Sequence, residues 1–122
     1  MNPNSPFFSR SSPSRPRTVD KTYGVLPFTW HRLLEVLATF RQIEKAVLFG
    51  SRALGRARRG SDIDLVLMGP EVTSRIALEV AGQLNEREPL PYQFDVLSWN
   101  QVDSPELREH VERAGKVIFQ RG

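Results

Sequence analysis

Two aspartates stand two residues apart in Asp62-Ile63-Asp64, directly before the apolar run Leu65–Met68. In a strand, residues i and i+2 leave the same face, so both carboxylates would point to one side of a sheet. Carboxylates at that spacing repel each other unless a positive charge lies between them. A hard divalent cation with oxygen ligands, above all Mg²⁺, would remove the conflict. For an isolated pair, however, the simpler interpretation is two solvated acids at a strand end, paired with neighbouring arginines.

A third aspartate, Asp95, lies in Phe94-Asp95-Val96-Leu97, a run that otherwise resembles a core strand. A carboxylate buried in such a strand needs a partner, and a metal ion shared with Asp62 and Asp64 would provide one. The local sequence is equally compatible with an aspartate at a strand edge or one paired with an arginine. Both interpretations stay open at this point.

Gly50-Ser51 follows the apolar run Val47–Phe49 and is expected to end a strand there. Glycine lets a ligand approach the backbone closely, and the next N–H groups together with the Ser51 hydroxyl can cradle a phosphate. Neither the Walker pattern GxxxxGK[ST] nor the Rossmann pattern GxGxxG is present. By itself, Gly-Ser after a strand indicates only a turn.

The connection between this turn and the aspartate pair is crowded with arginines. These are Arg52, Arg56, Arg58 and Arg59. Their guanidinium groups could bind triphosphate oxygens in bidentate fashion, neutralise the aspartates or form a solvated face. We expect phosphate contact from Arg52 and surface charge from the other three.

The composition excludes several other kinds of site. The chain has no cysteine, which rules out disulfides, thiolate metal sites and a cysteine nucleophile and suits a reducing cytosol. Its two histidines, His31 and His110, are far apart in sequence, which disfavours a histidine-built zinc site. His110, beside Leu107 and Val111, is expected to be structural. Two-metal phosphoryl chemistry, which needs carboxylates and no histidine, is what remains.

The net charge of +3 is unevenly distributed. Residues 1–19 hold three arginines and no acidic residue, which leaves fourteen basic and fourteen acidic residues from Asp20 onward. The remainder is therefore formally neutral, and a general nucleic-acid-binding surface is not expected. No apolar run approaches the roughly 20 residues that span a bilayer. We expect a cytoplasmic protein without a membrane segment.

The chain of 122 residues is long enough for one domain with a single core. Residues 1–24, which are rich in proline and serine, are expected to be a disordered basic tail, and residues 25–122 the domain. An organellar transit peptide is the alternative for the tail. It is disfavoured because its amphipathic helix would be interrupted by Pro3, Pro6, Pro13 and Pro16.

Periodicity and turn residues predict the elements that must position these side chains. Trp30 is expected to anchor a helical apolar stripe in the core, and the strand 61–68 to lie inside the sheet. The elements are a helix over about 30–44 with Thr29 as N-cap, a strand at 45–49, a short helical turn, a strand at 61–68, a helix at 71–87, a strand at 92–99, a helix from Pro105 to Gly115 capped by Ser104, and a strand at 116–120. The order α-β-(short α)-β-α-β-α-β predicts one α+β domain with a mixed sheet.

The spacing of the parts is more specific than any one of them. Gly50-Ser51, ten residues and then Asp62-Ile63-Asp64 resembles the pattern of the minimal (MNT-type) nucleotidyltransferases in the DNA polymerase beta-like superfamily. It stands here as GSRALGRARRGSDIDL, with the third aspartate in QFDVL, and the resemblance covers residues 30–121. It implies that the chain is similar to the short stand-alone members of that family.

The resemblance implies a role for each motif residue. Gly50 and Ser51 would hold the β- and γ-phosphates of a nucleoside triphosphate, with ATP as the expected donor. Asp62 and Asp64 would bind two Mg²⁺ ions. Asp95 would bind the catalytic ion and help to activate the attacking hydroxyl. In-line attack on the α-phosphate would then transfer a nucleoside monophosphate and release pyrophosphate.

Short members of this family are usually encoded with a small helical protein of the HEPN type. The resemblance therefore implies a hetero-oligomer in which the partner presents or is the hydroxyl acceptor, as in a toxin–antitoxin pair; a homodimer is the other assembly considered. Two further functions stay open. One is a non-catalytic, antitoxin-like binding module, which the intact motif set disfavours. The other is a small-molecule, aminoglycoside-like nucleotidyltransferase, which the absence of a second domain disfavours.

Overall fold

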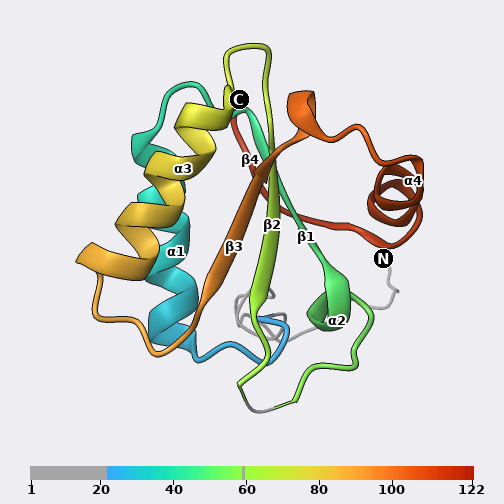
Figure 1. The fold of residues 1–122 in the computed structure, drawn as a ribbon. Coiled ribbons are helices and arrows are strands. Elements are labelled where there is room, and N and C mark those ends of the chain that lie inside the picture. The colour runs from blue at the N-terminus through green and yellow to red at the C-terminus, as the bar shows by residue number, and fades with distance from the viewer. Residues whose placement is uncertain (1–21, 59) are drawn as a thin grey trace, which may run out of the picture.

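The computed structural model describes residues 22–58 and 60–122 and contains a four-stranded sheet with helices on both faces (Figure 1). The elements are α1 (Pro27–Thr39), β1 (Lys45–Phe49), α2 (Gly50–Ala53), β2 (Ile63–Met68), α3 (Ser74–Gly82), the π-turn η2 (Gln83–Arg87), β3 (Phe94–Ser98), the 3-10 turn η3 (Trp99–Gln101), α4 (Pro105–Ala114) and β4 (Lys116–Gln120). The predicted order of helices and strands is confirmed, with η2 and η3 as additions.

The strands lie in the order β3-β2-β1-β4. β1 is antiparallel to both β2 and β4, whereas β2 and β3 are parallel. The predicted interior position of β2 is confirmed, and Leu65, Val66 and Leu67 are fully buried there. A mixed sheet with helices on its faces makes this an α+β domain, as predicted.

Alternation along the strands divides the core between the two faces of the sheet. On one face, Leu48 and Leu65 pack with residues of α1 and α3, such as Leu33 and Val80. On the other face, a smaller cluster contains Val47, Phe49, Val66, Val102 and Val111, the last of these from α4. Figure 1 shows α1 and α3 on one side of the sheet and α4 on the opposite side. Asp64 belongs to the α4 face, because it alternates with Leu65 in the same strand as Val66.

The first helix starts and ends earlier than predicted. Pro27 occupies the first turn after the N-cap residue Leu26, and the helix ends at Thr39. The prediction of Thr29 as N-cap is wrong, because proline with its preset φ already starts the helix at Pro27, three residues earlier than predicted. Thr29 lies inside the helix and is buried. Trp30 is a core residue, as predicted.

The starts of α3 and α4 are set by the residues that cap them. The helix predicted over 71–87 begins only at Ser74, because the Thr73 hydroxyl accepts a hydrogen bond from the N–H of Ile76 at 3.2 Å. The predicted cap of α4 is confirmed: the Ser104 hydroxyl accepts from the N–H of Leu107 at 3.2 Å, and Pro105 follows. The strands predicted at 61–68 and 92–99 are shorter, as their bounds above show.

The predicted tail, residues 1–24, lies outside the described residues except for its last three. Tyr23 packs against Trp30 with ring centroids 5.7 Å apart, and its carbonyl oxygen accepts a hydrogen bond from Arg52. Tyr23, just before the predicted boundary at residue 25, therefore already contacts residues of the domain.

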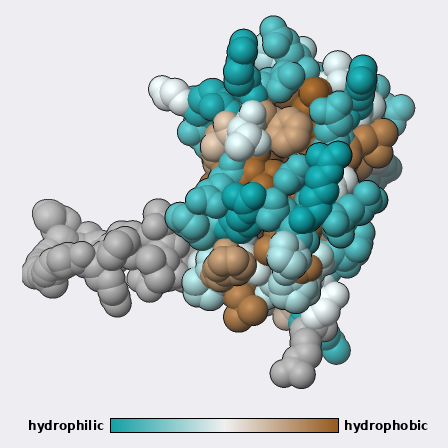
Figure 2. Space-filling view, turned by 90° about the vertical axis from the view of Figure 1, so that its left-hand side faces the viewer, coloured by the Kyte–Doolittle hydropathy of each residue, from teal (hydrophilic) through white to brown (hydrophobic). Residues whose placement is uncertain are grey.

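The surface is mixed in character. On the side of α1 and α3, hydrophilic residues predominate and separate smaller hydrophobic areas (Figure 2). Among the described residues, the exposed large apolar side chains are Leu26 and Phe28 at the start of α1, Leu54 after α2, Leu78 on α3 and Val117 on β4. None of the helices in the described part of the chain is long and apolar enough to cross a bilayer.

Candidate active site

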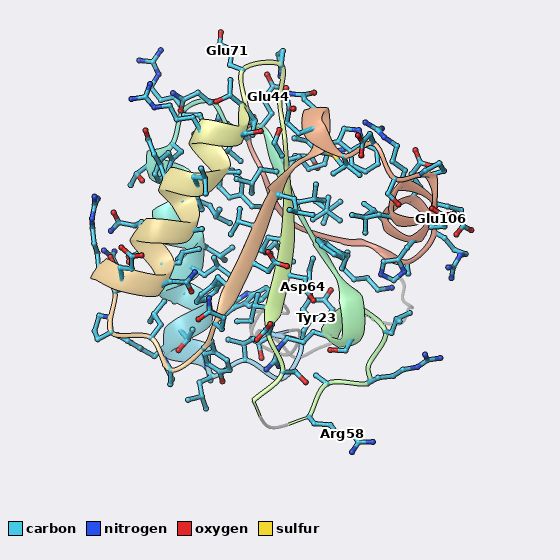
Figure 3. All side chains as sticks on the ribbon, in the orientation of Figure 1. Tyr23, Glu44, Arg58, Asp64, Glu71 and Glu106 are labelled. Atoms are coloured by element: carbon cyan, nitrogen blue, oxygen red, sulfur yellow. The ribbon has the colours of Figure 1, made fainter. Side chains whose placement is uncertain are left out.

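The parallel pairing of β2 and β3 brings two of the predicted site residues together. In its register Asp64 lies opposite Asp95, so both side chains leave the same face of the sheet. In the antiparallel pairing on the other side of β2, Asp64 lies opposite Phe49. Because Gly50 directly follows Phe49, the turn and the two aspartates meet at one end of the sheet. Figure 3 shows Asp64 there, beside α2.

Gly50 is in direct contact with this carboxylate. Its φ is +78°, in the left-handed region. A Cβ atom at this position would lie 2.3 Å from Oδ2 of Asp64, far inside van der Waals contact. Both the backbone angle and the contact therefore require glycine at this position. Gly50 is also the first residue of α2. After this helix, the Ser51 carbonyl accepts a hydrogen bond from the N–H of Arg56 at 2.8 Å.

The electrostatics of Asp64 reflect its neighbours. Burial raises the pKa of its carboxyl group, the negative charge of Asp95 raises it further, and Asp62 adds to the effect. Arg52 and His110 lower the pKa of Asp64 in part. Within residues 22–58 and 60–122, no basic side chain forms an ion pair with any of the three aspartates. The site therefore concentrates negative charge.

A cation is the ligand that this charge favours. Asp62 and Asp95 are exposed and Asp64 is half-buried. In the described residues, no group of three acidic or histidine side chains converges closely enough to enclose an ion as it stands. The donor set nevertheless fits Mg²⁺, because carboxylate oxygens are its preferred protein ligands and often only one or two bind it directly. Asp95 is exposed on the edge strand β3 rather than buried in the core, and its part in metal binding stays a prediction.

The side chain of Arg52 points into the domain. It is buried, at 5% exposure. Nη1 donates to the carbonyl of Tyr23 at 3.0 Å and Nη2 to the carbonyl of Ser61 at 2.9 Å. Its guanidinium carbon lies 5.3 Å from the centroid of the Tyr92 ring. The guanidinium points inward because two backbone carbonyls and an aromatic face bind it there, and its contact with a phosphate stays a prediction. The exposed Arg56 and Arg58 agree with the predicted surface charge, and Arg59 is outside the described residues.

His110 reaches the site from α4, which the sequence did not indicate. Its Nε2 accepts a hydrogen bond from the N–H of Gly50 at 3.0 Å, across a separation of 60 residues. The ring also packs edge-on against Phe49, with centroids 6.1 Å apart. No local pattern could have placed this residue at the turn, because the contact depends on where α4 crosses the sheet.

Comparisons with known proteins agree with this geometry. The family model described as Polymerase beta, Nucleotidyltransferase matches residues 31–122. The Probable protein adenylyltransferase MntA of Haemophilus influenzae is 30% identical over 73 residues, 60% of this chain. The matched part makes up 63% of that relative, so the chain covers less than two thirds of its length.

Solved structures share the fold. A crystal structure of a toxin–antitoxin with AMP-PNP superposes with a TM-score of 0.63 at 22% identity, over 75% of this chain and 73% of that one. A structure of tri-AMPylated Shewanella oneidensis HEPN toxin in complex with MNT antitoxin gives a TM-score of 0.58 at 19% identity, over 77% of this chain and 71% of that one. At these identities the similarity shows the fold.

The family resemblance predicted from the interval between Gly50-Ser51 and Asp62 is thereby confirmed. The motif positions, the strand register and the family match point the same way. The chain belongs to the polymerase beta nucleotidyltransferase family.

Proposed function

We propose that this chain is a Mg²⁺-dependent nucleotidyltransferase that transfers AMP from ATP to a hydroxyl group of a HEPN-type helical partner protein. The observation that carries the proposal is the junction of Gly50, Asp64 and Asp95. A glycine turn able to receive phosphates touches one carboxylate, and the strand register sets a second beside it. This combination suits a polyphosphate bound through metal ions.

Each residue of the candidate site has a defined part in the proposed reaction. Gly50 lets the nucleotide approach the backbone closely, and the hydroxyl and N–H of Ser51 would receive its outer phosphates. Asp62, Asp64 and Asp95 would hold the Mg²⁺ ions. When bound, such ions stabilise the attacking and the leaving oxygen of an in-line displacement. Asp95 is exposed on the edge strand, so an acceptor hydroxyl can reach it.

The choice of acceptor follows from the relatives. The relative in Haemophilus influenzae is described as a protein adenylyltransferase. Structures with the same fold contain an AMPylated HEPN toxin with its MNT antitoxin, or AMP-PNP in a toxin–antitoxin. A partner that carries the acceptor also fits a chain whose described residues form one small domain. The absence of cysteine is in line with a reducing, cytoplasmic setting.

The test is transfer of label. The protein is incubated with Mg²⁺, α-labelled ATP and the helical protein encoded beside it, and label is followed on the partner. Asp64→Asn and Asp95→Asn should reduce labelling at least about 1,000-fold, because loss of a metal ligand removes much of the transition-state stabilisation. Asp103→Asn, at an exposed aspartate beyond β3, is the matched control and should label as the unaltered protein does.

Two outcomes would overturn the proposal. Labelling that survives both substitutions would refute the site assignment. Partner binding without any labelling, equal in the unaltered protein and in Asp64→Asn, would instead support a binding module.

A further inference from the structure

The contact between His110 and Gly50 joins the middle of α4 to the turn. Nε2 of His110 accepts the N–H of Gly50 at 3.0 Å, while the ring edge packs on Phe49. The histidine thus touches the last residue of β1 and the first residue of the turn. A hydrogen bond of this length has good geometry for an N–H donor.

The backbone of Gly50 is held from two sides. The carboxylate of Asp64 lies against its Cα, where a Cβ would come within 2.3 Å of Oδ2, and His110 holds its N–H. Because each peptide unit is planar, the φ and ψ angles of Gly50 fix the direction of the Ser51 N–H relative to the Gly50 N–H that His110 holds.

α4 is a firm support for such a contact. Val111, the residue after His110, is buried in the core cluster on this face. Arg108 donates from Nε to the carbonyl of Val102 at 2.7 Å and from Nη2 to the carbonyl of Trp99 at 3.0 Å. Its guanidinium carbon lies 4.3 Å from the centroid of the Trp99 ring. The helix is therefore fastened to the segment after β3 as well as to the sheet.

We propose that His110 is a positioning residue for nucleotidyl transfer: it holds the Gly50-Ser51 turn in the conformation that receives the phosphates. The inference rests on the proposed function. To accept the Gly50 N–H, Nε2 must carry no proton, so the ring holds its proton on Nδ1. His110 touches neither substrate nor metal ligand in this role; it acts through the backbone of Gly50.

Two substitutions at His110 distinguish the effect of its hydrogen-bond acceptor from the effect of its aromatic ring. His110→Gln keeps an acceptor at about the reach of Nε2, whereas His110→Phe keeps the aromatic contact with Phe49 and removes the acceptor. We expect His110→Phe to lower kcat/KM for ATP about tenfold, since small displacements of positioning groups cost rate. His110→Gln should stay within about threefold of the unaltered protein. His31→Gln is the control, because His31 is exposed on α1.

The His110→Gln variant also distinguishes a loss of the hydrogen bond to Gly50 from a loss of positive charge near Asp64. His110 lowers the pKa of Asp64, and neither glutamine nor phenylalanine can carry a positive charge. Rescue by glutamine therefore indicates the hydrogen bond, and equal impairment of both variants would overturn the proposal in favour of charge.

A second readout does not depend on activity. Hydrogen exchange of the Gly50 amide, followed by NMR, should be slow in the unaltered protein and in His110→Gln, and at least about tenfold faster in His110→Phe. The long-range ¹H–¹⁵N spectrum should show the Nδ1–H tautomer for His110, assigned with the His31→Gln variant. Unchanged exchange in His110→Phe, or the Nε2–H tautomer, would overturn the positioning role. If the NMR results are as expected but the unaltered protein transfers no nucleotide, the proposed function is wrong. The hydrogen bond by which His110 holds Gly50 is then still supported.

Discussion

At the scale of single residues, the site depends on a glycine, which has no side chain, at position 50. Gly50 combines a φ of +78° with close contact to the carboxylate of Asp64. Another glycine in the following loop, Gly55, has a φ of +74° but nothing within 4 Å of an added Cβ. The two glycines therefore share the backbone requirement and differ in the contact.

Gly50→Ala should remove activity, and Gly55→Ala should not. Each substitution places an L side chain in the left-handed region at a cost of about 1–2 kcal/mol in the free energy of unfolding. Only Gly50→Ala also displaces the Asp64 carboxylate, so transfer should fall at least about 100-fold. The measurements are chemical denaturation and the labelling assay. Equal loss of transfer in the two variants would show that the contact with Asp64 is unimportant.

Asp64 should make stability depend on pH. Because the pKa of its carboxyl group is raised in the folded protein, the fold binds this proton more tightly than the unfolded chain does. Stability should therefore fall as pH rises from the ordinary carboxyl pKa through the raised one, and stay lower above it. In EDTA at pH 7, Asp64→Asn should raise the free energy of unfolding by at most about 1 kcal/mol, since solvent screens a half-exposed group. The gain should vanish in acid below the ordinary carboxyl pKa, and a gain that grows in acid would contradict the assignment.

At the scale of elements, Arg52 links three segments that are separate in sequence. From α2 it binds the carbonyl of Tyr23 before α1 and the carbonyl of Ser61 before β2, and it lies against Tyr92 before β3. A guanidinium group can bind both carbonyls at once because it is planar and carries several N–H donors at fixed angles. The segments around the site are thus held together from within the domain.

Arg52→Lys should destabilise the fold. A single ammonium group cannot reproduce the fork, so at least one of the two partly buried carbonyls loses its donor. We expect a loss of about 2–3 kcal/mol in the free energy of unfolding by chemical denaturation. Arg56→Lys, at an exposed arginine of the same loop, should change it by less than about 0.5 kcal/mol. A stable Arg52→Lys variant that binds ATP more weakly would instead support the predicted phosphate role of Arg52.

At the scale of the whole molecule, one face of the sheet forms most of the core and the other face forms the candidate site. One face packs on α1 and α3 and holds most of the core, and the other carries the aspartates and α4 (Figures 1 and 3). Ligands that bind this second face bind only the folded chain, because the register of β2 and β3 creates the site.

ATP with Mg²⁺ should therefore raise the thermal midpoint of the unaltered protein. At ten times the dissociation constant, linkage gives about 1.4 kcal/mol of added stability. The double variant Asp64→Asn with Asp95→Asn should show little shift, and Asp103→Asn the full shift, in calorimetry with and without EDTA. A full shift in the double variant would place nucleotide binding elsewhere.

Much of this could be predicted from sequence because the signals were local. The strand at 45–49, the Ser104 cap with Pro105 and the last strand follow from periodicity and capping chemistry, and the structure has them at those residues. The start of α1 was misplaced because Thr29 is a good capping residue, but Pro27 precedes it. The interval between Gly50-Ser51 and Asp62 was enough to predict the family, since a motif depends on order along the chain.

The sequence by itself determined the set of candidate residues: a glycine turn and three aspartates. Only the tertiary structure decided how they are used. Strand register set Asp95 beside Asp64, a buried environment turned Arg52 inward, and the crossing of α4 brought His110 to the N–H of Gly50. These contacts join residues far apart in the chain. The packing of the whole domain determines such distances, so no local pattern encodes them.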